Sequence, residues 1–143
     1  MSDLYDTDIL LWSEEQAAKL RRLAASDRSN TDRLDWPNII EEIEDVGRNT
    51  IRACRSHVVQ ALLHDLKADA WPNASYVPHW RAEARAQRDQ ARDEYTLSMR
   101  QRMDMAELYR RALNAMPDTM DGNPPLPVPP DCPITLEELL AVS

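Results

Sequence analysis

The sequence has little glycine and no phenylalanine: two glycines and no Phe occur among its 143 residues. Two isolated glycines cannot form a glycine-rich phosphate-binding loop, and the chain contains no GxSxG motif for a nucleophilic serine. Alanine, leucine, arginine, glutamate and aspartate dominate instead, and most of these residues favour helices. The composition therefore predicts an all-α protein that lacks the familiar nucleotide-binding and hydrolase motifs.

The sequence also has few cysteines and no long apolar run. No stretch approaches the length needed to cross a bilayer, and the opening residues MSDLYDTD are acidic, unlike a signal peptide. We therefore expect a cytoplasmic protein with no membrane partner. Cys54 and Cys132 lack CxxC or CxxH spacing, so we expect both thiols to be reduced and structural, with Cys54 buried on an apolar helix stripe.

Acidic groups outnumber basic ones: 25 Asp and Glu against 17 Lys and Arg give a net charge of −8. A basic excess occurs in residues 79–116, which carry 8 basic and 6 acidic side chains. A surface with this overall charge repels polyanions, so only that middle segment is suited to an acidic partner. We do not expect nucleic acid to be the main partner.

One long helix over residues 36–67 organises the predicted fold. Apolar residues step along it by three and four and so share one face: Ile40, Ile43, Gly47, Ile51, Cys54, Val58, Ala61 and Leu62. Asp35 can cap the start of this helix, and Pro37 falls in its first turn, where the missing N–H costs little. Glycine within a helix costs about 1 kcal/mol relative to alanine, so we expect another backbone or a tryptophan ring close against Gly47.

Shorter helices are expected on both sides of the central one. The patterns predict a helical bundle over residues 13–116 with about four main helices, at 13–25, 36–67, 78–96 and 99–116. Ser13 with Gln16 forms a capping box that would start the first of these. Residues 1–12 would form an N-terminal arm. The weak apolar pattern near Ser98 favours a break, although one continuous helix over 78–116 stays open.

The C-terminal residues 117–143 form a proline-rich tail that holds seven of the ten prolines. Such a segment cannot be helical or a central strand. Thr135 and Glu138 form a second capping box, so a short helix over 135–141 is expected to close the chain. We expect this helix to dock on the bundle, and residues 1–143 to form a single helical domain.

Several motifs follow one another along the chain: YDTD, W and EQA near the start, LDWxNxxEEIExxG in the central helix, HDLK at its end, then WRxxxxxQR and CPxTLEELL. With these motifs the chain resembles the bacterial family known as domain of unknown function family 29. The resemblance covers nearly the whole chain. It implies a small, all-helical, cytoplasmic bacterial protein, and it brings no established activity, cofactor or catalytic residue.

The candidate functional residues form a polar set on the central helix and on the helix that follows it. They are Glu41, Glu44, His64, Asp65, Arg81, Arg85 and Arg88. Paired carboxylates with a histidine suit a metal or acid–base chemistry, but the Glu-x-x-His segments of di-iron bundles are missing. The arginine row, continued by Arg92, matches phosphate geometry. The alternative is structural, in which acids and arginines pair with one another. We assign these residues no catalytic role, no metal and no cofactor.

Two ion-pair contacts are expected within this polar set. A compact connector after the central helix would bring Asp65 or His64 against the Arg81–Arg85 end of the next helix. Glu41 or Glu44 would pair with a base from the later part of that helix or from the one after it. Both contacts would make the polar set part of the fold.

The sequence leaves three functional hypotheses. The first is a non-catalytic helical module that binds another protein or forms a homodimer, because recognisable reaction chemistry is missing while amphipathic helices, Met and Trp are abundant. The second is an enzyme or metal protein that uses Glu41, Glu44 and His64, with the arginine row holding an anionic substrate. The third is nucleic-acid binding through the same arginines. We favour the first and therefore lean toward a protein without enzyme activity.

Overall fold

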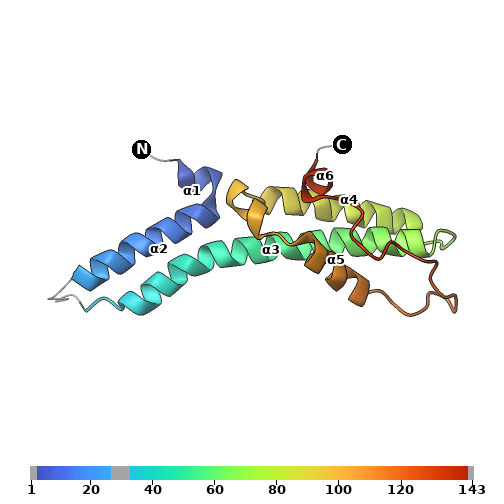
Figure 1. Ribbon diagram of the computed structural model, residues 1–143, viewed down its shortest axis with the longest axis horizontal. Helices are drawn as coiled ribbons and strands as arrows, with labels where there is room; N and C mark the ends of the chain where they lie inside the picture. The colour runs from blue at the N-terminus through green and yellow to red at the C-terminus, as the bar shows by residue number, and fades with distance from the viewer. Residues whose placement is uncertain (1–2, 27–32, 142–143) are drawn as a thin grey trace. The chain divides into compact units, whose positions relative to one another are not determined.

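The computed structural model describes residues 3–26 and 33–141, and the described residues form helices and connecting segments without a β-strand (Figure 1). The elements are α1 (Leu4–Thr7), α2 (Ile9–Ser26), α3 (Trp36–Ala70), α4 (Val77–Glu94), the 3-10 helix η1 (Leu97–Arg102), α5 (Met105–Asn114) and α6 (Leu136–Leu140). An isolated β-bridge joins Met120 and Asn123. The protein is therefore all-α, as the composition predicts.

The chain divides into two compact units. The first comprises Met1–Arg52 and Tyr95–Arg100, and the second comprises Ala53–Glu94 and Gln101–Ser143. The long helix α3 contributes residues to both units. Each unit is described by itself below, and a single domain over 1–143 stays a prediction.

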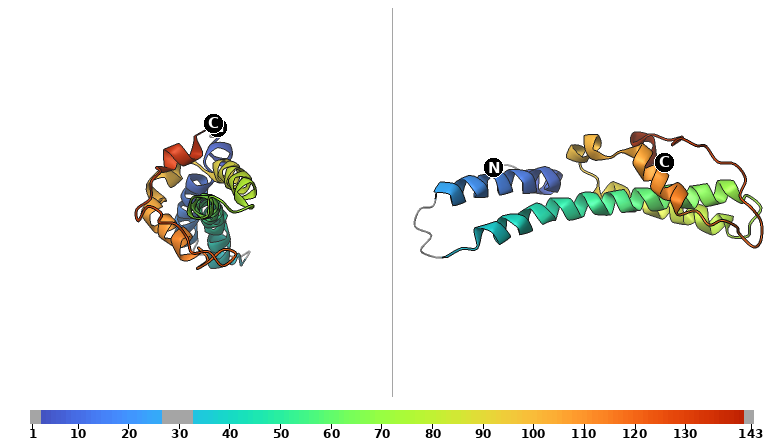
Figure 2. Two further views of the ribbon diagram at one scale, coloured as in Figure 1. Left: turned by 90° about the vertical axis from the view of Figure 1, so that its right-hand side faces the viewer. Right: turned by 60° about the horizontal axis from the view of Figure 1, so that its bottom comes forward.

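Two antiparallel helices, α2 and the first half of α3, form the core of the first unit (Figure 2). The helices approach closely at Gly47: a Cβ atom built there would lie 2.8 Å from Leu10 Cδ1 and 3.2 Å from Leu10 Cα, and it would overlap Ser13 Oγ. This confirms the predicted close approach at Gly47, although the neighbour is the backbone and side chains of α2 and not a tryptophan ring.

The first unit corrects the predicted start of the second helix. α2 begins at Ile9 and not at residue 13, because Asp8 caps it by accepting a hydrogen bond from the Leu11 N–H at 3.1 Å. Ser13 is fully buried inside α2, where its hydroxyl donates to the Leu10 carbonyl at 2.8 Å. The capping box expected at Ser13 is therefore wrong, and most of the predicted arm over 1–12 is helical.

Asp8 also holds the segment Tyr95–Arg100 in the first unit. Its carboxylate accepts hydrogen bonds from the Ser98 backbone N–H at 2.8 Å and from the Ser98 hydroxyl at 2.6 Å. Asp8 is 7% exposed. Burial raises its pKa, but the hydrogen bonds from Ser98 and from the Leu11 N–H outweigh burial and lower the pKa below its usual value. One carboxylate thus caps α2 and anchors a segment ninety residues away.

The second unit is built on the later half of α3 and on α4, which run antiparallel. Contacts along the pair show the register: Cys54 Sγ donates to the Ala91 carbonyl at 3.4 Å, and His57 Nδ1 lies 2.8 Å from Gln87 Oε1. The predicted central helix extends past residue 67 to Ala70, where the chain enters the connector that contains Pro72. The buried side chains that α3 contributes here include Val58, Ala61, Leu62, Leu63 and Leu66.

The chain breaks after α4, as the weak pattern near Ser98 predicts, but the predicted helix over 99–116 is wrong. Residues 97–102 form the 3-10 helix η1, and α5 starts only at Met105. The reason is Asp104, whose side chain accepts from the Glu107 N–H and caps α5. The fourth predicted helix is therefore two shorter elements.

The proline-rich tail docks on the second unit, as expected. The Leu126 N–H donates to the Ala70 carbonyl at 2.9 Å, and the Trp71 indole N–H donates to the Asn123 carbonyl at 3.0 Å. The Tyr109 hydroxyl donates to the Pro129 carbonyl at 2.6 Å. The capping box at α6 is present as predicted, and α6 contacts α4. Hydrogen bonds therefore hold the tail at several points along its length.

Candidate functional site

The strongest polar cluster of the second unit is centred on Asp65 of α3. Its two carboxylate oxygens accept hydrogen bonds from Arg81 Nη1 at 2.8 Å and from Arg88 Nη2 at 2.6 Å. Arg81 Nη2 donates to Asp69 at 2.7 Å. The side chain of Asp65 is 23% exposed, so water screens these ion pairs only in part. This cluster ties α4 to α3.

Helix geometry explains why these four residues meet. Asp65 and Asp69 are four residues apart on α3, and Arg81 and Arg88 are seven apart on α4, so each pair shares one helix face. The compact connector between the helices makes them antiparallel neighbours. The predicted contact of Asp65 with the Arg81–Arg85 end of the helix is confirmed for Arg81.

A small cavity of about 160 Å³ lies beside this cluster, lined by its two acids and two arginines together with Tyr109 and Ile134, among others. Two carboxylates face two guanidinium groups, so the cluster is balanced in formal charge. The hydrogen bonds from Asp69 and Asp65 raise the pKa of Arg81. A charge-neutral cluster whose members already bind one another favours the structural interpretation over an anion-binding site.

The other two predicted members in the second unit lie outside this cluster. His64 Nδ1 lies 2.7 Å from the Gln60 carbonyl of its own helix, and no contact between it and the arginines is recorded among the described residues. Arg85 is exposed on α4. The fourth arginine of the row, Arg92, binds Asp89 and the Leu140 carbonyl. The row is thus occupied by protein partners at three of its four positions.

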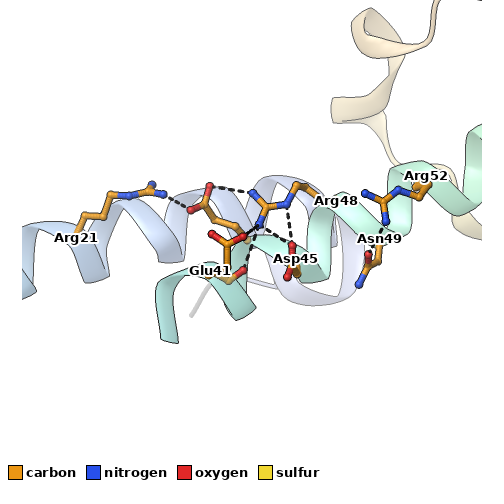
Figure 3. Close-up of polar contacts among 7 residues, drawn as sticks. Arg21, Glu41, Asp45, Arg48, Asn49 and Arg52 are labelled. Atoms are coloured by element: carbon orange, nitrogen blue, oxygen red, sulfur yellow. Dashed lines mark hydrogen bonds and ion pairs between the residues drawn. The ribbon is translucent and has the colours of Figure 1, made fainter. Parts of the chain in front are cut away.

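Glu41 and Glu44 belong to the first unit, where a basic side chain of each helix binds them (Figure 3). Glu44 pairs with Arg21 of α2 and lies 3.7 Å from Arg48 of α3. Arg48 also binds Glu41 at 3.1 Å and Asp45 at 2.6 Å. The predicted partner of Glu41 and Glu44 is therefore wrong, because α2 and α3 themselves supply the bases.

The thiols and acids show how reactive chemistry is placed. Cys54 is fully buried, and burial raises its pKa to about 11, so it is not a thiolate nucleophile. Both cysteines are free, and Cys132 is half-buried. Within residues 3–26 and 33–141, no group of three or more His, Cys, Asp and Glu side chains is arranged to hold a metal ion.

The sequence analysis missed three residues of the second unit that shape its polar surface. Asp69 shares a helix face with Asp65, so its spacing was a usable signal. Tyr109 lines the cavity by the arginines, and its partner Pro129 lies in a segment without periodicity. A larger cavity of about 380 Å³ lies between the end of α3 and the tail, with Trp71 in its lining. No sequence pattern marks that cavity.

Comparison with known proteins adds the family. A family model described as domain of unknown function DUF29 matches residues 4–143. The chain belongs to this family. The DUF29 chain is also similar to a crystal structure of an alpha-helical protein of unknown function from Rhodospirillum rubrum, with 28% identity and a TM-score of 0.81 over 98% of this chain and 90% of that one. No curated protein sequence matches the chain.

The resemblance seen in the sequence motifs is therefore confirmed, and so is the all-α fold. Both the DUF29 family and the neighbour from Rhodospirillum rubrum carry the description of unknown function. No helix among the described residues of this DUF29 chain has the length and apolarity of a membrane span.

Proposed function

We propose that the protein is a non-catalytic module that works by binding another polypeptide through helix packing. The observation that supports this is an apolar surface on the α2–α3 hairpin of the first unit. We call it the hairpin face and define it by Leu20, Leu23, Ile39, Ile43 and Val46. Leu23 is 54% exposed and Val46 is 38% exposed, and the other three are partly exposed.

The hairpin face follows from an apolar stripe on α3 that is wider than α2 covers. Ile40, Gly47 and Ile51 are buried within the first unit. Ile39 and Val46 lie about a quarter-turn away on the same helix, at 100° per residue. A helix that is apolar on more than one side normally has neighbours on both flanks. The second flank of α3 is where a partner would pack.

Leu20 and Leu23 extend this surface onto α2. The buried stripe of α2 contains Leu10, Ser13 and Ala17, and Leu20 and Leu23 are turned away from it by roughly 50–110°. Because α2 runs antiparallel to α3, that turn brings them to the side of the hairpin that carries Ile39 and Val46. Contiguous exposed apolar side chains rimmed by polar residues are typical of protein interaction sites.

The test is a tagged chain produced in a bacterial host together with an untagged copy, from which bound polypeptides are identified and quantified. Val46→Glu places a charge in the hairpin face and is expected to release the bound polypeptide, whether that is a second copy or another protein. Leu97→Glu is the matched control, because Leu97 is 73% exposed and lies outside the hairpin face. A chain that captures nothing, or that captures the same polypeptides after Val46→Glu, would refute the proposal.

We further propose that this binding takes place in the bacterial cytoplasm. The support is indirect and chemical: both cysteines are free thiols, and structural disulfides are rare in that compartment. Fractionation of cells that produce the tagged chain tests the location. Recovery in the periplasmic or membrane fraction would contradict it.

A further inference from the structure

The hairpin face carries one charged side chain on each of its two edges. Lys19 of α2 lies beside Leu23 on the edge away from α3, and Glu42 of α3 lies beside Val46 on the edge away from α2. Both residues are exposed, and neither has a recorded ion-pair partner within residues 3–26 and 33–141. The hairpin face is therefore apolar along its middle, basic on one edge and acidic on the other.

Lys19 and Glu42 lie at about the same height along the hairpin. The register follows from two contacts of the first unit: Gly47 lies against Ser13, and Glu44 pairs with Arg21. In an antiparallel pair these contacts place Lys19 opposite a residue near position 43 of α3. The two unpaired charges thus face each other across the width of the apolar stripe and are too far apart to pair within one copy.

This arrangement is complementary to itself. Two hairpins can pack face to face about a two-fold axis in two ways, and in each a contact from residue i to residue j is repeated from j to i. If α2 lies on the partner's α2, Lys19 meets a second Lys19 and Glu42 meets a second Glu42. If α2 lies on the partner's α3, each Lys19 meets a Glu42, and this happens on both edges.

We infer that the hairpin face binds a second copy of this chain, with α2 of each copy packed on α3 of the other and two Lys19–Glu42 ion pairs at the edges. The inference rests on the proposed function and names its partner. Apolar burial supplies most of the affinity, and the edge charges fix the orientation. The product is a four-helix arrangement in which every neighbouring helix pair is antiparallel.

The test is sedimentation equilibrium of the full chain and of two charge-reversal variants. The wild type is expected to dimerise, while Lys19→Glu and Glu42→Lys each place two like-charged pairs at the edges. Each variant alone should raise the dimer dissociation constant by about 10-fold to 100-fold. Mixing the two variants should restore dimers. On one edge the introduced glutamate of one copy then meets the introduced lysine of the other, and on the other edge the native Glu42 meets the native Lys19.

A control separates the edge from the general effect of charge. Arg22→Glu makes the same charge change on α2, but Arg22 lies on the other side of the helix, away from the hairpin face. It should leave the dissociation constant within about twofold of the wild type. Far-ultraviolet circular dichroism of every variant confirms that the helices are intact.

The outcomes distinguish this inference from the proposed function. A wild type that stays monomeric, yet captures another polypeptide that Val46→Glu releases, overturns the second-copy inference and supports the proposed function. A dimer that Val46→Glu disrupts, but that the mixed charge variants do not restore, overturns the orientation and again supports the function. A monomer that captures nothing overturns both.

Discussion

Asp8 and Ser98 are joined by two hydrogen bonds across ninety residues of sequence, with the carboxylate of Asp8 accepting from both the backbone N–H and the hydroxyl of Ser98. The same carboxylate caps α2 through the Leu11 N–H. One buried side chain therefore fixes the start of a helix and the path of a distant segment.

Asp8→Asn should destabilise the protein by about 1–3 kcal/mol at pH 7, because a neutral amide offers one acceptor oxygen in place of two charged ones. The folded pKa of Asp8 lies below its ordinary value of 3.8. Its contribution is therefore complete above about pH 5 and is lost as the pH falls through the folded pKa.

Urea unfolding in steps from pH 7 to pH 3 measures this difference. The gap between wild type and Asp8→Asn should shrink at the acidic end. Asp6→Asn is the control, because Asp6 is exposed on α1, and it should change the free energy of unfolding little at any of these pH values. A gap that stays constant with pH would show that the charge of Asp8 is not what matters.

Gly47→Ala should lower the free energy of unfolding by about 1–3 kcal/mol even though alanine favours helices by about 1 kcal/mol. The added Cβ would lie 3.2 Å from Leu10 Cα, which is backbone, and would overlap the Ser13 hydroxyl. Thermal and urea unfolding provide the measurement. Adding Ser13→Ala should recover part of the loss, and a rise in Tm for Gly47→Ala alone would disprove the close-approach argument.

Asp65→Ala should cost about 1–3 kcal/mol, because it leaves Arg81 and Arg88 without a shared carboxylate in a half-buried site. Asp69→Ala removes one ion pair at a side chain that is 53% exposed, so it should cost about 0–1 kcal/mol. Urea unfolding at low and at high salt compares the two. Equal losses would mean that Asp65 is no more central than its neighbour.

The two cysteines should differ in reactivity. At pH 8 a thiol with a pKa of about 11 is ionised in only about one molecule in a thousand, and Cys54 is also fully buried. A chromogenic disulfide reagent should therefore label the half-buried Cys132 in the folded protein and both thiols in urea. The Cys132→Ser variant should be almost unreactive until it unfolds, and rapid labelling of its native form would contradict the burial of Cys54.

Local and periodic features could be predicted from the sequence. The long run of apolar steps predicted α3, and the capping residues Asp35 and Thr135 marked the starts of α3 and α6 within a residue of their observed positions. The contact of Asp65 with Arg81 was predictable because a short connector forces antiparallel neighbours. Each of these inferences used residues that are close in sequence or joined by one turn.

Features that depend on tertiary contacts could not be predicted in the same way. Asp8 resembles any other acid of an acidic N-terminus, and only folding brings Ser98 to it. Glu44 has bases in several directions, and periodicity does not say that Arg21 will be the one that reaches it. The hairpin face was equally hidden, because an apolar stripe on α3 does not reveal how much of it α2 covers.

The docked tail has a consequence for the order in which the second unit is made. The Ala70 carbonyl at the end of α3 has no partner until the Leu126 N–H is made, and the same holds for Arg92 and the Leu140 carbonyl. At about 5–20 residues per second, roughly 3–11 s pass between synthesis of Ala70 and of Leu126. During that interval the nascent α3 and α4 expose the surface that the tail later covers. A ribosome that stalls within this stretch would therefore present an unfinished second unit to chaperones and proteases.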